Sequence, residues 1–176
     1  MTFDVQIVEL WAEKIALEVA PGEAELAAMY AHAFVAGGSR RADLFRRAPG
    51  GPPGAFGPAG VPALTPLVLQ AVQDYAPGLL VVLSSGYAER AVRVIRDLLG
   101  IRDSLASKGS KSSSGKAAPA SPLAPVKDFM DTLTRELQAA NLSREQSEVI
   151  AYRVLRAMLE EPAEAARFVQ HVAAVR

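Results

Sequence analysis

VKDFMDTLTRELQAANLSREQ, residues 126–146, contains the end of one helical pattern and the start of another. Its apolar residues recur at steps of three and four, a spacing that places them on one face of an α-helix. They are Val126, Met130, Leu133, Leu137 and Ala140. Asn141 ends this pattern, and Ser143 with Gln146 three residues later forms a capping box that opens the next helix. The stretch therefore predicts two helices joined by a short turn.

The helical pattern continues to the end of the chain. The helix opened at Ser143 is expected to stop at Glu161-Pro162, and a last helix follows. The apolar faces of these two helices consist of Ile150, Val154, Leu155 and Met158 in the first and Ala165, Phe168, Val172 and Val175 in the second. Residues 124–176 are thus predicted to form a three-helix module, close to the lower size limit for folding alone. Its remaining apolar surface would suit a partner or a second copy, with candidate partner-binding residues Met130, Leu133, Leu137, Val154, Met158, Phe168 and Val172.

The composition changes abruptly before this module. Residues 104–123 consist mainly of Ser, Lys, Gly, Ala and Pro and contain almost no apolar mass. Such a segment does not bury enough apolar surface to offset the entropy cost of becoming ordered, so we expect a disordered linker. The sequence therefore predicts two helical modules, residues 1–103 and 124–176. It leaves open whether they dock.

The N-terminal module is predicted to be mainly helical. Residues 4–20 follow a helical period, although residues 2–10 also fit a short strand; the helix is favoured because the pattern persists to residue 19. A second helix is expected over residues 23–35, ending at Gly37-Gly38. Its apolar residues are Leu26, Ala27, Met29, Tyr30 and Phe34.

Helix-capping and helix-breaking residues in the rest of this module predict shorter elements. Ser39 is placed to cap a short basic helix, and Thr65-Pro66 is typical of a helix start. Residues 79–83 fit either a buried strand or a helical turn, and residues 87–99 fit a helix. The predicted fold class is mainly α, with at most one or two short strands in the N-terminal module.

The amino-acid composition excludes some kinds of functional site and disfavours others. The 176 residues contain no cysteine, which excludes disulfides, thiolate metal sites and a cysteine nucleophile. The formal net charge is zero, so the chain as a whole has no attraction to nucleic acid or anionic lipid. We expect no signal peptide and no membrane span, because polar residues and prolines interrupt the most apolar region. These features favour a cytoplasmic protein, and the Ala/Arg/Gly/Pro-rich composition favours a bacterial source.

Two local features are candidates for partner contacts. The Gly/Pro-rich loop over residues 49–62 contains GPPGAFGPAG, which is too short for a collagen triple helix. Phe56 in this loop either docks on a partner or pins the loop to the core, and pinning is favoured. The arginines Arg40, Arg41, Arg46 and Arg47 flank Leu44 and Phe45. They would bind an acidic partner or pair within the chain with Glu9, Glu13, Glu18 or Glu25, and internal pairing is favoured.

Other residues give weaker signals. LLVVLSSG, residues 79–86, has the layout of a strand and turn before a helix, but no phosphate-binding motif follows it. His32 and His171 lack nearby ligands at metal-binding spacing. We therefore expect no catalytic residues, no metal and no cofactor.

The favoured function is a non-enzymatic adaptor or assembly protein that acts through helix-mediated contacts with a protein partner or with itself. One alternative is a small regulator that contacts nucleic acid through the arginine cluster. Another is a nucleotide- or ligand-binding domain that uses residues 79–86 and requires a sheet.

Overall fold

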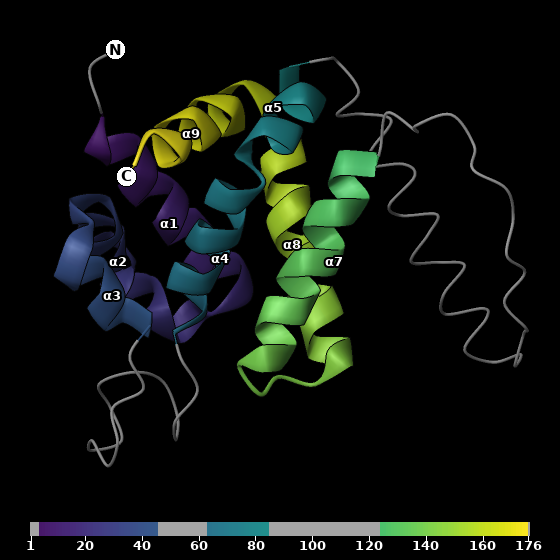
Figure 1. The fold of residues 1–176 in the computed structure, drawn as a ribbon, viewed down its shortest axis with the longest axis horizontal. Coiled ribbons are helices and arrows are strands. Elements are labelled where there is room, and N and C mark those ends of the chain that lie inside the picture. The colour runs from purple at the N-terminus through teal and green to yellow at the C-terminus, as the bar shows by residue number, and fades with distance from the viewer. Residues whose placement is uncertain (1–3, 46–62, 85–123, 176) are drawn as a thin grey trace, which may run out of the picture.

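Helices are the only regular elements in the part of the chain that the computed structural model describes, residues 4–45, 63–84 and 124–175. Eight α-helices and one 3-10 helix lie in these ranges (Figure 1). They are α1 (Val5–Val19), η1 (Pro21–Glu23), α2 (Ala24–Ala36), α3 (Gly38–Phe45), α4 (Leu64–Asp74), α5 (Ala76–Ser84), α7 (Ala124–Ala139), α8 (Arg144–Glu160) and α9 (Pro162–Ala174). The predicted helical character is confirmed for these residues. In the two segments with a strand alternative, residues 5–10 and 79–83 are helical.

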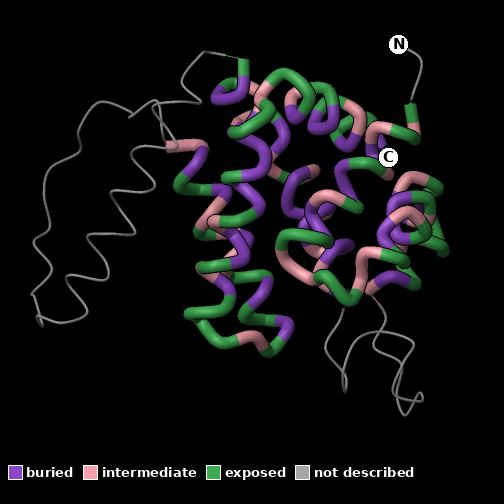
Figure 2. Tube along the Cα trace, turned by 180° about the vertical axis from the view of Figure 1, so that it is seen from behind, coloured by how far each residue is buried: buried purple, intermediate pink, exposed green. Residues whose placement is uncertain are grey.

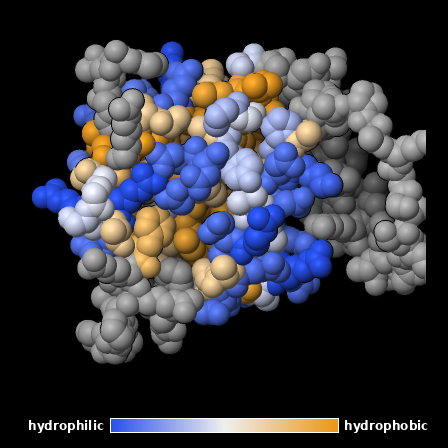
Figure 3. Space-filling view, in the orientation of Figure 1, coloured by the Kyte–Doolittle hydropathy of each residue, from blue (hydrophilic) through white to orange (hydrophobic). Residues whose placement is uncertain are grey.

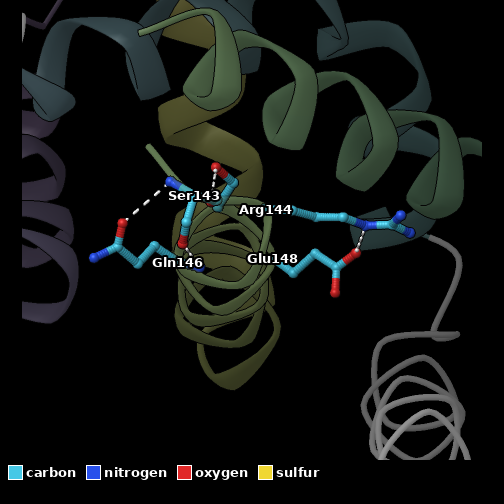
Figure 4. Close-up of polar contacts among 5 residues, drawn as sticks. Ser143, Arg144, Gln146 and Glu148 are labelled. Atoms are coloured by element: carbon cyan, nitrogen blue, oxygen red, sulfur yellow. Dashed lines mark hydrogen bonds and ion pairs between the residues drawn. The ribbon is translucent and has the colours of Figure 1, made fainter. Parts of the chain in front are cut away.

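Several helix ends follow from local sequence. Asp4 caps α1, because its Oδ1 accepts a hydrogen bond from the Gln6 amide at 3.0 Å. Gly37 ends α2 at a φ of 65°, and Asn141 adopts a φ of 71° in the turn after α7. The capping box at Ser143 is present (Figure 4). The backbone N–H of Gln146 donates to Ser143 Oγ at 3.2 Å, and the backbone N–H of Ser143 donates to Gln146 Oε1 at 3.1 Å.

Two predicted caps are wrong. Ser39 is not a cap, because α3 begins one residue earlier, at Gly38. Thr65 is not the cap of α4 either, since the helix begins at Leu64. The carboxylate of Glu23, in η1, accepts hydrogen bonds from the Leu64 amide at 2.8 Å and from the Thr65 amide at 2.9 Å. The Thr65 hydroxyl donates to the same carboxylate at 2.8 Å, so the start of α4 is held by a side chain from another element.

The helices before and after the predicted linker share one hydrophobic core. Helix α9 packs on α1, α4 and α5, while α7 packs on α4, α5 and α8 and α8 also packs on α1. Buried residues line the inner sides of these helices and exposed residues the outer sides (Figure 2). The N-terminal and C-terminal helices are therefore docked on each other. The predicted linker, the Gly/Pro loop and the helix expected over residues 87–99 lie outside the described residues.

Aromatic residues form part of the contact between the two groups of helices. Trp11 of α1 stacks on Phe168 of α9, with ring centroids 5.3 Å apart and planes 13° from parallel. The Tyr75 hydroxyl lies 2.8 Å from Thr132 Oγ1, and the Tyr75 ring meets Phe129 edge to face. The contact thus combines packed rings with a satisfied polar group.

No single described helix has both the length and the apolar character that a membrane crossing requires. Helices α4 and α5 meet that test only as a pair, and the pair is bent by 77°.

Candidate interaction surface

The apolar seams predicted to bind a partner face the interior of the chain. Six of the seven seam candidates are fully buried, and Met130 is half-buried against the core. The six are Leu133, Leu137, Val154, Met158, Phe168 and Val172. The spacing identified the buried faces of α7, α8 and α9, but these faces are covered by helices of the same chain. A partner would reach them only if the helices separated.

The two described arginines of the predicted cluster lie in different environments. Arg40 is exposed, whereas Arg41 is half-buried and its guanidinium lies 4.1 Å from the centroid of the Phe34 ring. Arg41 Nη2 donates hydrogen bonds to Gln70 Oε1 at 2.5 Å and to Gln73 Oε1. Burial lowers the pKa of Arg41, and the charge of Asp74 acts in the opposite direction.

Arg41 belongs to a polar network that joins three helices. Gln73 Nε2 donates to the backbone carbonyls of Val172 at 3.2 Å and Val175 at 2.6 Å, at the end of α9. Gln70 Nε2 donates to both carboxylate oxygens of Asp74, at 2.9 and 3.0 Å. Internal pairing of Arg41 was the favoured interpretation, but its hydrogen-bond partners are glutamines of α4 rather than acids of the first two helices. The network links α3, α4 and α9.

The other predicted contact residues add little surface. Phe45 is half-buried and packs against the core. Arg46, Arg47 and Phe56 lie outside the described residues. Residues 79–83 belong to helix α5, with Leu79, Val82 and Leu83 buried, so they do not form the strand that the ligand-binding alternative requires.

The titratable groups do not form a metal cluster in the described ranges. His32 Nε2 lies 2.5 Å from Glu9 Oε1, while His171 Nδ1 accepts a hydrogen bond from the Asp4 amide at 3.3 Å. Within these ranges there is no group of three or more His, Cys, Asp or Glu residues that could hold a metal ion. Burial raises the pKa of Tyr30, and the charge of Glu23 adds to that effect.

Exposed apolar side chains gather on the hairpin of α1 and α2. Leu10 and Leu17 of α1 are 65% and 62% exposed, and Met29 of α2 is 54% exposed. Of the five apolar residues named for this predicted helix, Ala27, Tyr30 and Phe34 are buried, whereas Leu26 and Met29 are exposed. We call Leu10, Glu13 and Leu17 of α1, with Glu25 and Met29 of α2, the hairpin surface.

Helix geometry places residues of the two helices at matching levels along the hairpin. The contact between Glu9 and His32 marks one pair of positions at which the two helices lie level. One turn further along α1 and one turn back along α2, Glu13 comes level with Met29; after another turn, Leu17 comes level with Glu25. Apolar and acidic side chains therefore alternate across the surface. Polar side chains dominate the face drawn in Figure 3, with smaller hydrophobic patches along its upper edge and in its left half.

The sequence contains a signal for this surface. Val8, Trp11 and Ile15 define the buried face of α1, and Leu10 and Leu17 lie seven residues apart on the opposite face, among polar residues. An amphipathic helix needs one apolar face for the core, so two large leucines on the opposite face add apolar surface beyond that need. No family model matches the chain, and no curated protein or solved structure matches it.

Proposed function

We propose that the protein is a non-enzymatic adaptor or assembly protein that acts through helix-mediated protein–protein contacts. The observation that carries this proposal is the hairpin surface, where three large apolar side chains are each more than half exposed on two neighbouring helices. Covering such side chains contributes about 25 cal/mol for each Å² removed from water. The same helices pack on the rest of the core through their other faces, so the surface is held by a folded scaffold.

The environments of the other candidates favour this proposal over its alternatives. Arg41, which the nucleic-acid alternative needs as a free cation, is hydrogen-bonded to Gln70 and Gln73. Residues 79–83 are helical, which removes support from the ligand-binding alternative. The hairpin surface itself carries two glutamates and no lysine or arginine, a composition unsuited to a polyanion.

The test compares the full chain with the double variant Leu10→Gln/Leu17→Gln. Light scattering over a wide range of concentrations measures self-association, and affinity capture from cell extract measures binding to other proteins. The wild type should form a defined oligomer or retain a protein at fixed stoichiometry, and the double variant should lose that association. Val149→Gln is the matched control, because Val149 is a 48% exposed apolar residue on α8. A wild type that stays monomeric and captures nothing beyond the double variant would overturn the proposal.

A further inference from the structure

We infer that the hairpin surface binds a basic amphipathic helix of a partner protein. This inference rests on the proposed function and specifies the chemistry of the partner. It follows from two properties of the surface. The first is the negative charge beside its apolar residues, and the second is the spacing of its two leucines.

The two charged side chains of this surface, Glu13 and Glu25, are both negative. Glu13 lies three residues after Leu10 and four before Leu17, so it is on the same face as both. Three basic groups of the described residues that belong to or contact α1 and α2 have other partners. Lys14 Nζ binds Glu161 Oε1 at 2.8 Å, His32 contacts Glu9, and Arg153 Nη1 donates to the backbone carbonyl of Glu18 at 3.0 Å. In the described part of the chain, no ion pair involves Glu13 or Glu25. A segment that brings Lys or Arg to this surface would therefore place positive charges beside two glutamates that have no ion pair within the described ranges.

The apolar spacing suits a helix. Leu10 and Leu17 are seven residues, or about 10.5 Å, apart along α1, which is two helical turns. A partner helix with apolar residues at positions i, i+3 or i+4, and i+7 presents anchors at the same interval. Its flanking basic residues would then lie beside Glu13 and Glu25.

The same charges disfavour a second copy of the chain as the occupant. A symmetric pair would place one hairpin surface against another and bring the glutamates of one copy close to those of the other. Like charges placed together at an interface oppose association. An acidic segment would meet the same repulsion.

The experiment uses three synthetic peptides with identical leucine spacing and with arginine, glutamine or glutamate at the polar positions. Fluorescence anisotropy of each labelled peptide is measured against the full chain and against Glu13→Gln/Glu25→Gln. The arginine peptide should bind, and the double variant should weaken its binding roughly tenfold, as expected for two exposed ion pairs. Added salt should weaken binding to the wild type and have less effect on the variant.

The control for general charge is Asp131→Asn/Glu136→Gln on α7, where both residues are exposed and outside the hairpin surface. This variant should bind the arginine peptide as the wild type does, whereas Leu10→Gln/Leu17→Gln should lose binding. Equal binding of the glutamine or glutamate peptide would overturn the inference. So would failure of the arginine peptide to bind, or its undiminished binding to Glu13→Gln/Glu25→Gln. If the capture assay still depends on Leu10 and Leu17, the proposed function stands without this partner chemistry; if that dependence is also missing, both fail.

Discussion

Arg40 and Arg41 are adjacent in the chain and identical in chemistry, yet the fold uses them differently. Arg41→Ala removes the hydrogen bonds to Gln70 and Gln73 and the contact with the Phe34 ring, so we expect the free energy of unfolding to fall by about 1–2 kcal/mol. Arg40→Ala should change it by less than about 0.5 kcal/mol, because Arg40 is exposed. Urea denaturation of both variants measures the difference. Equal effects would mean that the network around Arg41 contributes nothing to stability.

The carboxyl group of Glu161 is expected to make the stability of the fold depend on pH. The hydrogen bond from Lys14, together with the charge of Lys14, lowers the pKa of Glu161 below the usual 4.5. A carboxyl whose pKa is lower in the folded chain stabilises the fold above its unfolded pKa, and that stabilisation is lost as pH falls through the folded pKa. The Tm of the wild type should therefore exceed that of Glu161→Gln at neutral pH, and the gap should close well below pH 4.5.

The control for this prediction is Glu136→Gln, which changes an exposed carboxylate on α7. Thermal melts at several pH values, followed by circular dichroism, measure all three proteins. A gap between the wild type and Glu161→Gln that stays constant down to acidic pH would show that the ionisation of Glu161 is not its cause.

Among the helices, the ends that follow from the sequence are those whose partners are close along the chain. Ser143 and Gln146 are three residues apart, so their capping box can be identified as a motif in the sequence. Glu23 and Thr65 are 42 residues apart, so nothing local indicates that Glu23 caps α4. Thr65 has the residue type of a cap, but its hydroxyl donates to Glu23 instead.

The cap supplied by Glu23 should have a measurable cost when it is altered. Glu23→Gln replaces one carboxylate oxygen with an NH₂ group, which cannot accept from the Leu64 or Thr65 amide. We expect the free energy of unfolding to fall by about 1–3 kcal/mol, the cost of leaving a part-buried donor unsatisfied. Glu25→Gln, an exposed change in the first turn of α2, should cost less than about 0.5 kcal/mol. Guanidinium denaturation followed by circular dichroism measures both, and equal losses would contradict the capping role.

Helix faces show a similar division between what was predictable and what was not. The spacing of Leu133, Leu137 and Val154 correctly marked faces that are buried, but periodicity does not say which element covers a face. That choice depends on contacts distant in sequence. Here α7 and α8 cover part of each other, and α1, α4 and α5 cover the rest. For the same reason, the sequence pattern did not predict the hairpin surface. Leu26 and Met29 look like core residues by type, and only the packing of α2 on its neighbours leaves them exposed.

For the whole molecule, the sequence predicted two helical modules and left their docking open. The composition of residues 104–123 marks a change in the chain, but it contains no information on whether the helices on either side pack together. Docking depends on how the side chains of distant helices fit, as in the stacking of Trp11 on Phe168 and the hydrogen bond between Tyr75 and Thr132. The shared core therefore predicts that all the described helices unfold together, whereas two independent modules would unfold separately.

Trp11 is the only tryptophan in the sequence, and its ring lies at the contact between α1 and α9. Because the core is continuous, unfolding followed by Trp11 fluorescence should coincide with unfolding followed by circular dichroism of all the helices. Phe168→Leu, a change in α9, should lower the free energy of unfolding by about 1–2 kcal/mol and shift both transitions together, because it removes the stacked ring and part of the core volume. Independent modules would instead give a circular dichroism transition in two steps, with Trp11 fluorescence following only one of them and largely unmoved by a substitution in the other module.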